Sequence, residues 1–467
     1  MSGSVVEMAK QAGLSRVLGA LGTLLIVLSA VTPASSVFSI VPGVIAQAGS
    51  GALLSFVVAA VIGLFMAYVY AELSSAFPTT GGEYTIIGRT LGRFWGFLAL
   101  FMNLITLVLI VAVVALGVGT YLGVLIPNLN PQWVAVVSII LCAVVAGLRI
   151  NLNAIVTGGF LAVELVALLI LIVLGFAHME RPFSSLLSAP QMLDAASNAL
   201  TPAPWSVIFA ATAVALFAYN GYGAAAYFGE ETHDARRSMG KVVLWVLAIT
   251  VIAEIVPLAA ILLGSPDLAA LIAAPQKVEY FLEARGGHAL TVLIRLAIAL
   301  AIFNAVIAIV LQAARLLYSS GRDGTWPASI SKAVSSVHAS NRSPWIATIV
   351  VAVLASAACF VDINLLFVVT GTSLVVLYFM LCVAVFAGRQ NGSTNDGHYR
   401  MPLFPVPAIL AGVALLYIGY QNFLDPVIGR PSLFATALML VAAAIYYALF
   451  LACRKDWKLM GPDDLSG

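Results

Sequence analysis

Long apolar runs separated by short polar segments make up most of this sequence. A helix that crosses a bilayer needs about 20 apolar residues, and on that basis the pattern predicts twelve membrane-spanning helices. The segments 178–204 and 265–288 carry prolines or charges, so we expect them to be solvated loops with at most a short surface helix, both on the outer side of the membrane. The expected spans are 17–47, 52–77, 95–124, 132–148, 154–177, 205–230, 240–264, 289–318, 345–361, 364–388, 403–422 and 432–453.

Two of these spans are interrupted by polar or glycine-rich residues. The stretch Thr32-Pro33-Ala34-Ser35-Ser36 lies within the first span, and Tyr219-Asn220-Gly221-Tyr222-Gly223 lies within the sixth. Every backbone polar group in hydrocarbon needs a partner inside the protein, so irregular backbone at that depth must be buried or must line a cavity. Broken helices at matching positions in two halves of a chain are typical of the binding site of a secondary transporter.

The positions of the two breaks predict an all-α integral membrane fold with an inverted repeat. A unit of five spans has an odd number of crossings, so its second copy enters the membrane from the opposite face. Spans one to five and six to ten would form this pair, and spans eleven and twelve would lie outside it. The predicted units are residues 1–177, the extracellular loop 178–204, residues 205–388, and residues 389–467.

Composition supports a membrane protein and excludes several function classes. Hydrophobic residues make up 62% of the chain and charged residues 9%, whereas soluble proteins average about 25% charged residues. A net charge of +2 gives no reason to expect a nucleic acid partner. The four cysteines and five histidines show no metal-ligand spacing, and no nucleophile–base pair is apparent, so we expect neither a cofactor, nor a metal, nor an enzyme.

The distribution of positive charge predicts the orientation. If the N-terminus is cytoplasmic, 17 of the 22 Lys and Arg residues fall on the cytoplasmic side, as the positive-inside rule requires. Both termini are then cytoplasmic. The first apolar run has no small-residue cleavage site, so it reads as an uncleaved span rather than a signal peptide. The five outer residues are Arg181, Lys277, Arg285, Arg295 and Arg430.

Three stretches resemble the amino acid–polyamine–organocation superfamily of permeases. They are Ala71-Glu72-Leu73-Ser74-Ser75-Ala76-Phe77-Pro78 followed by Gly81-Gly82-Glu83-Tyr84, then Phe217-Ala218-Tyr219-Asn220-Gly221-Tyr222 leading to Gly229-Glu230-Glu231-Thr232, and Arg315-Leu316-Leu317-Tyr318 with Gly321-Arg322-Asp323-Gly324. The resemblance implies a five-plus-five inverted-repeat (LeuT-like) fold, alternating access, and a substrate held between spans one, three, six, eight and ten. The first break of typical members is Gly-Ser-Gly followed by Val or Ile and Phe; the matching residues here are Ala34-Ser35-Ser36-Val37-Phe38.

The breaks supply most of the candidate substrate-binding residues. One half-helix presents free N–H groups that suit a carboxylate, and the other presents free carbonyl groups that suit an ammonium. Asn103 in span three and Asn304 in span eight are further buried amides that either line the path or join helices. The candidates are Thr32, Ala34, Ser35, Ser36, Asn103, Tyr219, Asn220, Gly221, Tyr222, Gly223 and Asn304.

Five acidic residues within or at the ends of spans are candidates for other roles. Glu164 lies inside span five, where a carboxylate suggests function. It occupies the approximate position at which proton-coupled relatives carry a Lys, so we expect it to couple transport to protons. Glu72, Glu230 and Glu231 lie at cytoplasmic ends of spans and are candidate gating residues. Glu254 has two interpretations: a structural pair with Arg295, or a role in transport.

These features predict a secondary active transporter of the bacterial plasma membrane that moves amino acids by alternating access with proton symport. One alternative is a polyamine or organic-amine importer, favoured by the glycine-poor first break and the buried acid. A second is an amino acid exchanger without ion coupling. A channel needs a continuous polar lining, which the sequence lacks. The expected partners are the substrate, a proton or other coupling ion, and the lipid bilayer; a monomer and a homodimer fit equally well.

Overall fold

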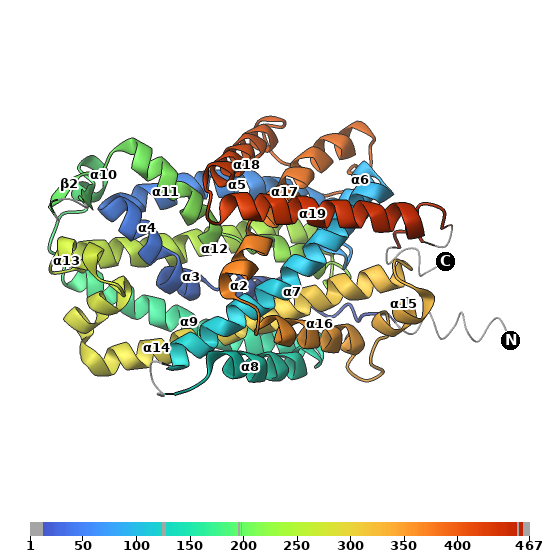
Figure 1. Ribbon diagram of the computed structural model, residues 1–467, viewed down its shortest axis with the longest axis horizontal. Helices are drawn as coiled ribbons and strands as arrows, with labels where there is room; N and C mark the ends of the chain where they lie inside the picture. Colours follow the sequence, from blue (N-terminus) through green and yellow to red (C-terminus); the bar gives the residue numbers. More distant parts are fainter. Residues whose placement is uncertain (1–12, 124–127, 195–196, 198, 455–456, 461–467) are drawn as a thin grey trace.

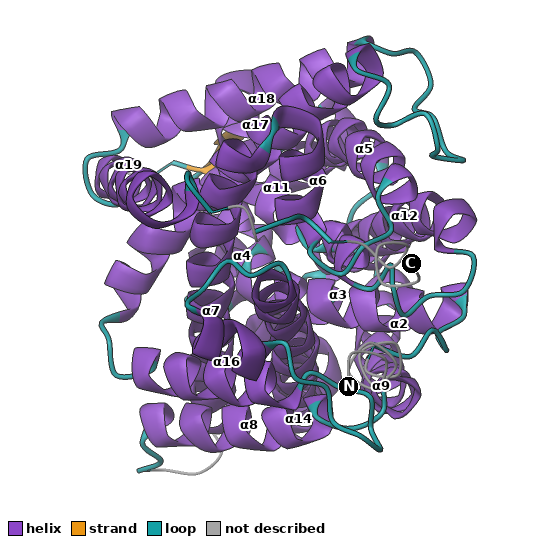
Figure 2. Cartoon of the chain, turned by 90° about the vertical axis from the view of Figure 1, so that its right-hand side faces the viewer, coloured by secondary structure: helices purple, strands orange, loops and turns teal. Residues whose placement is uncertain are grey.

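The chain folds almost entirely into helices that run along one long axis (Figure 1). The structure is a computed structural model that describes residues 13–123, 128–194, 197, 199–454 and 457–460. Within these residues one short antiparallel β-hairpin, coloured orange in Figure 2, joins Gln191–Leu193 (β1) to Leu200–Pro202 (β2). Residues 1–12 of the expected N-terminal segment, and Lys455 of the expected C-terminal tail, lie outside the described residues.

The first half of the chain follows the expected spans closely. The first span is divided into three helices. Its elements are α2 (Ala20–Val31), α3 (Pro33–Ser39), α4 (Val41–Ala48), η1 (Gly49–Gly51), α5 (Ala52–Ala76), α6 (Gly82–Leu91), α7 (Arg93–Gly123), α8 (Pro131–Ala146) and α9 (Ile150–Ala177).

The second half begins after the loop that carries α10 (Ser184–Ser188) and the hairpin. Its long helix α14 is divided at Gly287 (φ 77°), so the expected loop 265–288 contains a short helix before the span proper. The elements are α11 (Trp205–Ala218), η2 (Tyr222–Tyr227), α12 (Ala235–Gly264), α13 (Leu268–Ala273), α14 (Lys277–Arg322), α15 (Ala328–Val334), α16 (Trp345–Ala358), α17 (Ile363–Gln390), α18 (Val406–Leu424), α19 (Gly429–Tyr446) and η3 (Tyr447–Leu451).

Hydropathy and length make nine helical segments of the described chain candidates for membrane crossing. One of them, Ala20–Ala76, contains the first two expected spans, and the shorter apolar helices α8 and α16 occupy two more. Every expected span therefore contains an apolar helix. The crossing number of twelve and the inverted repeat stay predictions.

Local sequence explains where the helices begin. Asn130 accepts hydrogen bonds from the N–H groups of Gln132 (3.0 Å) and Trp133 (3.2 Å), and Pro131 takes the first position of α8, which suits proline because that position needs no N–H donor. Asp362 caps α17 in the same way, through the N–H groups of Asn364 and Leu365. This cap divides the long apolar run 345–388 into α16 and α17.

The helices of the two halves interleave around the centre of the molecule. α12 packs against α5 and α9, α14 packs against α7 and α9, and α2 packs against α9. The hairpin, α10 and α13 lie at one end, whereas α6 and α15 lie at the other (Figure 1). A side chain at Gly49 (φ 58°) would bring its Cβ to 2.0 Å from the Gln191 carbonyl oxygen, so the hairpin loop packs tightly on the turn between α4 and α5.

Candidate functional site

The first break is confined to a single residue. α2 ends at Val31, Thr32 takes a left-handed conformation (φ 48°), and α3 begins at Pro33. The expected irregular stretch of five residues is therefore shorter than the sequence suggests. Proline has a backbone angle that suits the first turn of a helix, so Pro33 restarts the helix immediately and Ala34, Ser35 and Ser36 are helical.

Glu164 of α9 binds this restarted helix. Its Oε1 atom accepts hydrogen bonds from the Ala34 N–H (2.7 Å) and the Thr32 hydroxyl (3.2 Å). The second carboxylate oxygen has no hydrogen-bond partner in the described chain, and the side chain is fully buried. A helix N-terminus carries positive partial charge, so in this conformation Glu164 occupies the Ala34 amide at the positive end of α3.

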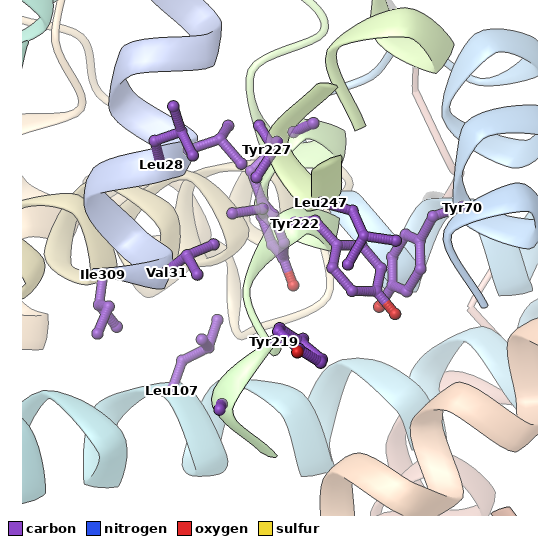
Figure 3. Packing of buried hydrophobic residues seen from close by; sticks show 14 of the residues in the cluster. Leu28, Val31, Tyr70, Leu107, Tyr219, Tyr222, Tyr227, Leu247 and Ile309 are labelled. Atoms are coloured by element: carbon purple, nitrogen blue, oxygen red, sulfur yellow. The ribbon is translucent and has the colours of Figure 1, made fainter. Parts of the chain in front are cut away.

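The second break lies directly against the first. α11 ends at Ala218, and the chain turns through Gly221 (φ 121°) into the 3₁₀ helix η2. A Cβ at Gly221 would stand 2.9 Å from a side-chain carbon of Val31, at the end of α2. Figure 3 shows Leu28 and Val31 of α2, Leu107 of α7 and Ile309 of α14 around the tyrosines of this region.

A cavity of about 90 Å³ lies between the breaks and the helices around them. It touches α2, α6, α7, the α11–η2 turn, α14 and α17. Four of the predicted substrate-binding residues line it. The polar lining residues are Glu83, Asn103, Asn220, Gln312 and Tyr378, together with the backbone of Gly221 and Gly223.

The other predicted substrate-binding residues have structural partners outside this cavity. Ser36 donates to the Ala218 carbonyl (3.3 Å), Tyr219 to the Phe56 carbonyl (3.0 Å), and Asn304 to the Thr157 carbonyl (3.1 Å). Tyr222 packs edge-on against the Tyr70 ring, 5.8 Å between centroids. Thr32 and Ala34 bind Glu164, and Ser35 is half-buried. Their roles in substrate binding stay predictions.

Glu83, like Gln312 and Tyr378, lines the cavity and was not among the predicted site residues. Its carboxylate accepts hydrogen bonds from the hydroxyls of Tyr70 (2.8 Å) and Tyr227 and from the Asn103 amide (3.1 Å). It is the one carboxylate among the described residues that line the cavity. A signal was present in the sequence, since Glu83 is the acidic residue of α6 and directly follows Gly81-Gly82.

The three predicted gating residues each form an ion pair at one end of the helices. Glu72 of α5 binds Arg389 of α17 through two contacts (2.7 and 2.6 Å), and Glu230 binds Arg322 of α14 through two contacts (2.7 and 3.0 Å). Glu231 binds Arg315 (2.9 Å), and both side chains are about 1% exposed. The Glu72 pair joins α5 to α17, and the other two pairs join the segment after η2 to α14, all at the end that we expect to be cytoplasmic.

One structural prediction was wrong: Glu254 does not pair with Arg295. Arg295 pairs with Glu279 in the first part of α14. Both oxygens of the fully buried Glu254 carboxylate have no hydrogen-bond partner in the described chain. The segment 265–288 is predicted to be a loop with at most a short surface helix, and the helix over the first part of α14 brings Glu279 to Arg295.

The geometry of two adjacent helix breaks around a polar cavity agrees with the comparison to known proteins. A family model described as amino acid permease matches residues 18–450. The chain belongs to the amino acid permease family. The expected membership of the amino acid–polyamine–organocation superfamily is thereby confirmed.

Relatives of this permease match over most of their length. An uncharacterised transporter of Mycobacterium tuberculosis is 28% identical over 427 residues, which cover 88% of this chain and 91% of the relative. The branched-chain amino acid permease BcaP of Bacillus subtilis is 24% identical over 426 residues, or 88% of each protein. The methylthioribose transporter of Bacillus subtilis is 23% identical over 408 residues, which cover 81% of this chain and 83% of the relative.

These names show that the permease is a transporter of the amino acid permease family, and its apolar helices make it a multi-pass membrane protein. Family and relatives are transporters rather than enzymes. The named relatives carry chemically different substrates, so membership alone leaves the substrate open.

Proposed function

We propose that this permease is a secondary active transporter that carries amino acids across the bacterial plasma membrane by alternating access. The observation that supports this most directly is the cavity between the two helix breaks. It combines one carboxylate, two asparagine amides and one glutamine amide with the backbone of Gly221 and Gly223. Because this cavity combines a carboxylate with amide donors and acceptors, it can exchange its internal hydrogen bonds for bonds to a guest that carries an amine and a carboxylate.

The substrate amine has a partner in this arrangement. Glu83 supplies the negative charge that an ammonium requires, and Ala30 places the carbonyl end of α2 at the same cavity. Helix C-termini carry negative partial charge. A substrate carboxylate would then bind the amide end of α3, which it can reach only when Glu164 releases the Ala34 N–H.

The proposed coupling ion is a proton, and its proposed carrier is Glu164. A proton on this carboxylate would remove the charge that holds the Ala34 N–H, so proton uptake and exposure of the substrate site would be linked. Transporters use intramembrane carboxylates as proton relays.

Alternating access would be carried by the inverted repeat. α5 packs against α12 and α7 packs against α14, and these are the second with the seventh and the third with the eighth predicted spans. The ion pairs of Glu72, Glu230 and Glu231 would hold the cytoplasmic end shut in this conformation and open it in the next. Both termini would be cytoplasmic.

Two alternatives follow from the same site. The carboxylate in the cavity and the occupied Ala34 amide favour an importer of polyamines or organic amines, which lack a carboxylate. An exchanger would use the same cavity without proton movement. Competition of putrescine against neutral amino acids distinguishes an amine importer from an amino acid transporter. Uptake without a pH gradient distinguishes an exchanger from a proton symporter.

The test is uptake of amino acids into proteoliposomes with and without an imposed proton gradient. We expect Glu164→Gln to abolish pH-driven accumulation and to retain exchange across the membrane, because the neutral side chain still fills the site. Glu283→Gln, which changes an exposed acid (53% exposed), is the matched control and should behave as the wild type. Unchanged pH-driven accumulation in Glu164→Gln would remove this residue from the coupling mechanism.

A further inference from the structure

A second buried carboxylate lies on α12, which packs against both α3 and α9 near the first helix break. Glu254 lies in α12, three residues before Pro257, and is completely buried. It lies beside the Ser36 hydroxyl of α3 and interacts electrostatically with Glu164 of α9. Ser36 itself donates to the Ala218 carbonyl, and neither oxygen of Glu254 has a partner in hydrogen-bonding geometry within the described chain.

The described surroundings of this acid pair contain no compensating cation. Of the titratable groups on the elements packed against α12, Glu164 and Tyr219 are the ones that interact with Glu254. The Tyr219 hydroxyl donates to the Phe56 carbonyl and not to an acid. Among the described residues no Lys, Arg or His forms an ion pair with Glu164 or Glu254.

Two neighbouring carboxylates in such a place cannot both be ionised. Each buried charge is costly without a partner, and like charges in one site disfavour each other. The donors are distributed unequally, since Glu164 has the Ala34 N–H, the Thr32 hydroxyl and the positive end of α3. Glu254 has none in the described chain, so the proton belongs on Glu254 when Glu164 carries the charge.

We propose that Glu254 and Glu164 together form one cation site behind the first helix break, which holds a single exchangeable proton. The inference rests on the proposed proton coupling and adds Glu254 as the second member of the site. In this conformation the proton is on a Glu254 oxygen. When the proton is instead on Oε2 of Glu164, that carboxyl group is neutral and its bond to the Ala34 N–H is weaker, and Glu254 carries the negative charge.

The experiment compares pH-driven amino acid accumulation for Glu254→Gln, Glu164→Gln and the double variant in proteoliposomes. At one proton per substrate, a gradient of one pH unit supports about tenfold accumulation. We expect each single variant to lose this tenfold accumulation while retaining exchange, which shows that the protein is folded. The double variant should accumulate substrate no less than either single variant, because the effects of substitutions in two residues that act as one unit do not add.

Glu254→Asp, which keeps a carboxyl group, should retain part of the pH-driven accumulation, and Glu279→Gln is the control for loss of a buried acid outside the pair. Tenfold accumulation in Glu254→Gln with loss in Glu164→Gln would overturn the role of Glu254 and leave the proposed function standing. Unchanged accumulation in both variants would overturn proton coupling as well. Accumulation that follows a sodium gradient at equal pH, and that Glu254→Gln abolishes, would overturn the proton as the occupant.

Discussion

At the scale of single residues, the central cavity differs from an ordinary helix contact by one charged side chain. Glu83 is held by two tyrosine hydroxyls and the Asn103 amide. A carboxylate is an acceptor only, and three donors fix its orientation toward the cavity. The site is therefore prepared to bind a positively charged group without rearrangement of the acid.

Replacement of this acid should weaken binding of amine-bearing substrates. In Glu83→Gln the negative charge is lost. The NH₂ group of the new side chain would also face a hydroxyl or amide group that now donates to the carboxylate. A hydrogen bond to a charged group contributes roughly 1.5–3 kcal/mol, so we expect KM for amino acid uptake to rise by about tenfold or more. Glu180→Gln, in the segment after α9 and 46% exposed, should leave KM unchanged. A wild-type KM in Glu83→Gln would show that the substrate amine binds elsewhere.

At the scale of elements, the contact between the two breaks depends on the absence of a side chain. Gly221 combines a positive φ with a close approach to Val31, and only glycine takes such angles without strain. The close approach brings the end of α2 and the start of η2 to the same cavity.

A methyl group at this contact should separate the broken helices. We expect Gly221→Ala to lower the uptake rate by at least tenfold and to lower the melting temperature of the purified protein, because both the backbone angle and the Val31 contact oppose it. Gly117→Ala in α7 is a matched control, since its Cβ would meet Ile302 at 3.5 Å, an ordinary contact distance. If Gly221→Ala transports like Gly117→Ala, the two breaks need not touch during transport.

At the scale of the whole molecule, the described part of the C-terminal tail covers the end that carries the three ion pairs. Trp457 is fully buried, its indole N–H donates to the Thr325 hydroxyl (3.1 Å), and the Arg93 guanidinium lies 4.5 Å from the ring centre. Further along the tail, the Met460 N–H donates to the Asp323 carboxylate (3.1 Å). The tail thus connects the start of α7 with the residues that follow α14.

This tail contact should make stability depend on pH. Burial raises the pKa of Asp323 from 3.8 to about 7, so the folded state holds a proton that the unfolded chain releases above pH 4. The corresponding stabilisation is present at low pH and is lost as pH rises toward 7, by no more than about 4 kcal/mol. Asp323→Asn removes this titration.

The measurement is the melting temperature of wild type and Asp323→Asn at pH 5 and pH 8. We expect the wild type to lose stability relative to the variant between these values. Asp396→Asn changes a largely exposed acid (75% exposed) near Arg236. Its melting temperature should change between pH 5 and pH 8 as that of the wild type does. Parallel changes in wild type and Asp323→Asn would mean that Asp323 titrates at its ordinary value.

The sequence alone determined the class of the protein, the positions of its helices and the location of both breaks. These follow from local chemistry: hydrocarbon selects long apolar helices, Pro33 restarts α3, and Asp362 starts α17. The family resemblance also depends on short contiguous stretches, which are visible in the sequence without the fold.

Only the tertiary structure decided which distant residues meet. In the structure Glu164 accepts a hydrogen bond from the Ala34 N–H, and Arg295 pairs with Glu279 rather than with Glu254. Glu83 lines the cavity. Apolar helices in a membrane are hydrophobic on nearly every side, so their sequence gives little indication of which face turns inward. The partner of a buried acid depends on how the helices pack. That packing is determined jointly by residues more than a hundred positions apart in the sequence.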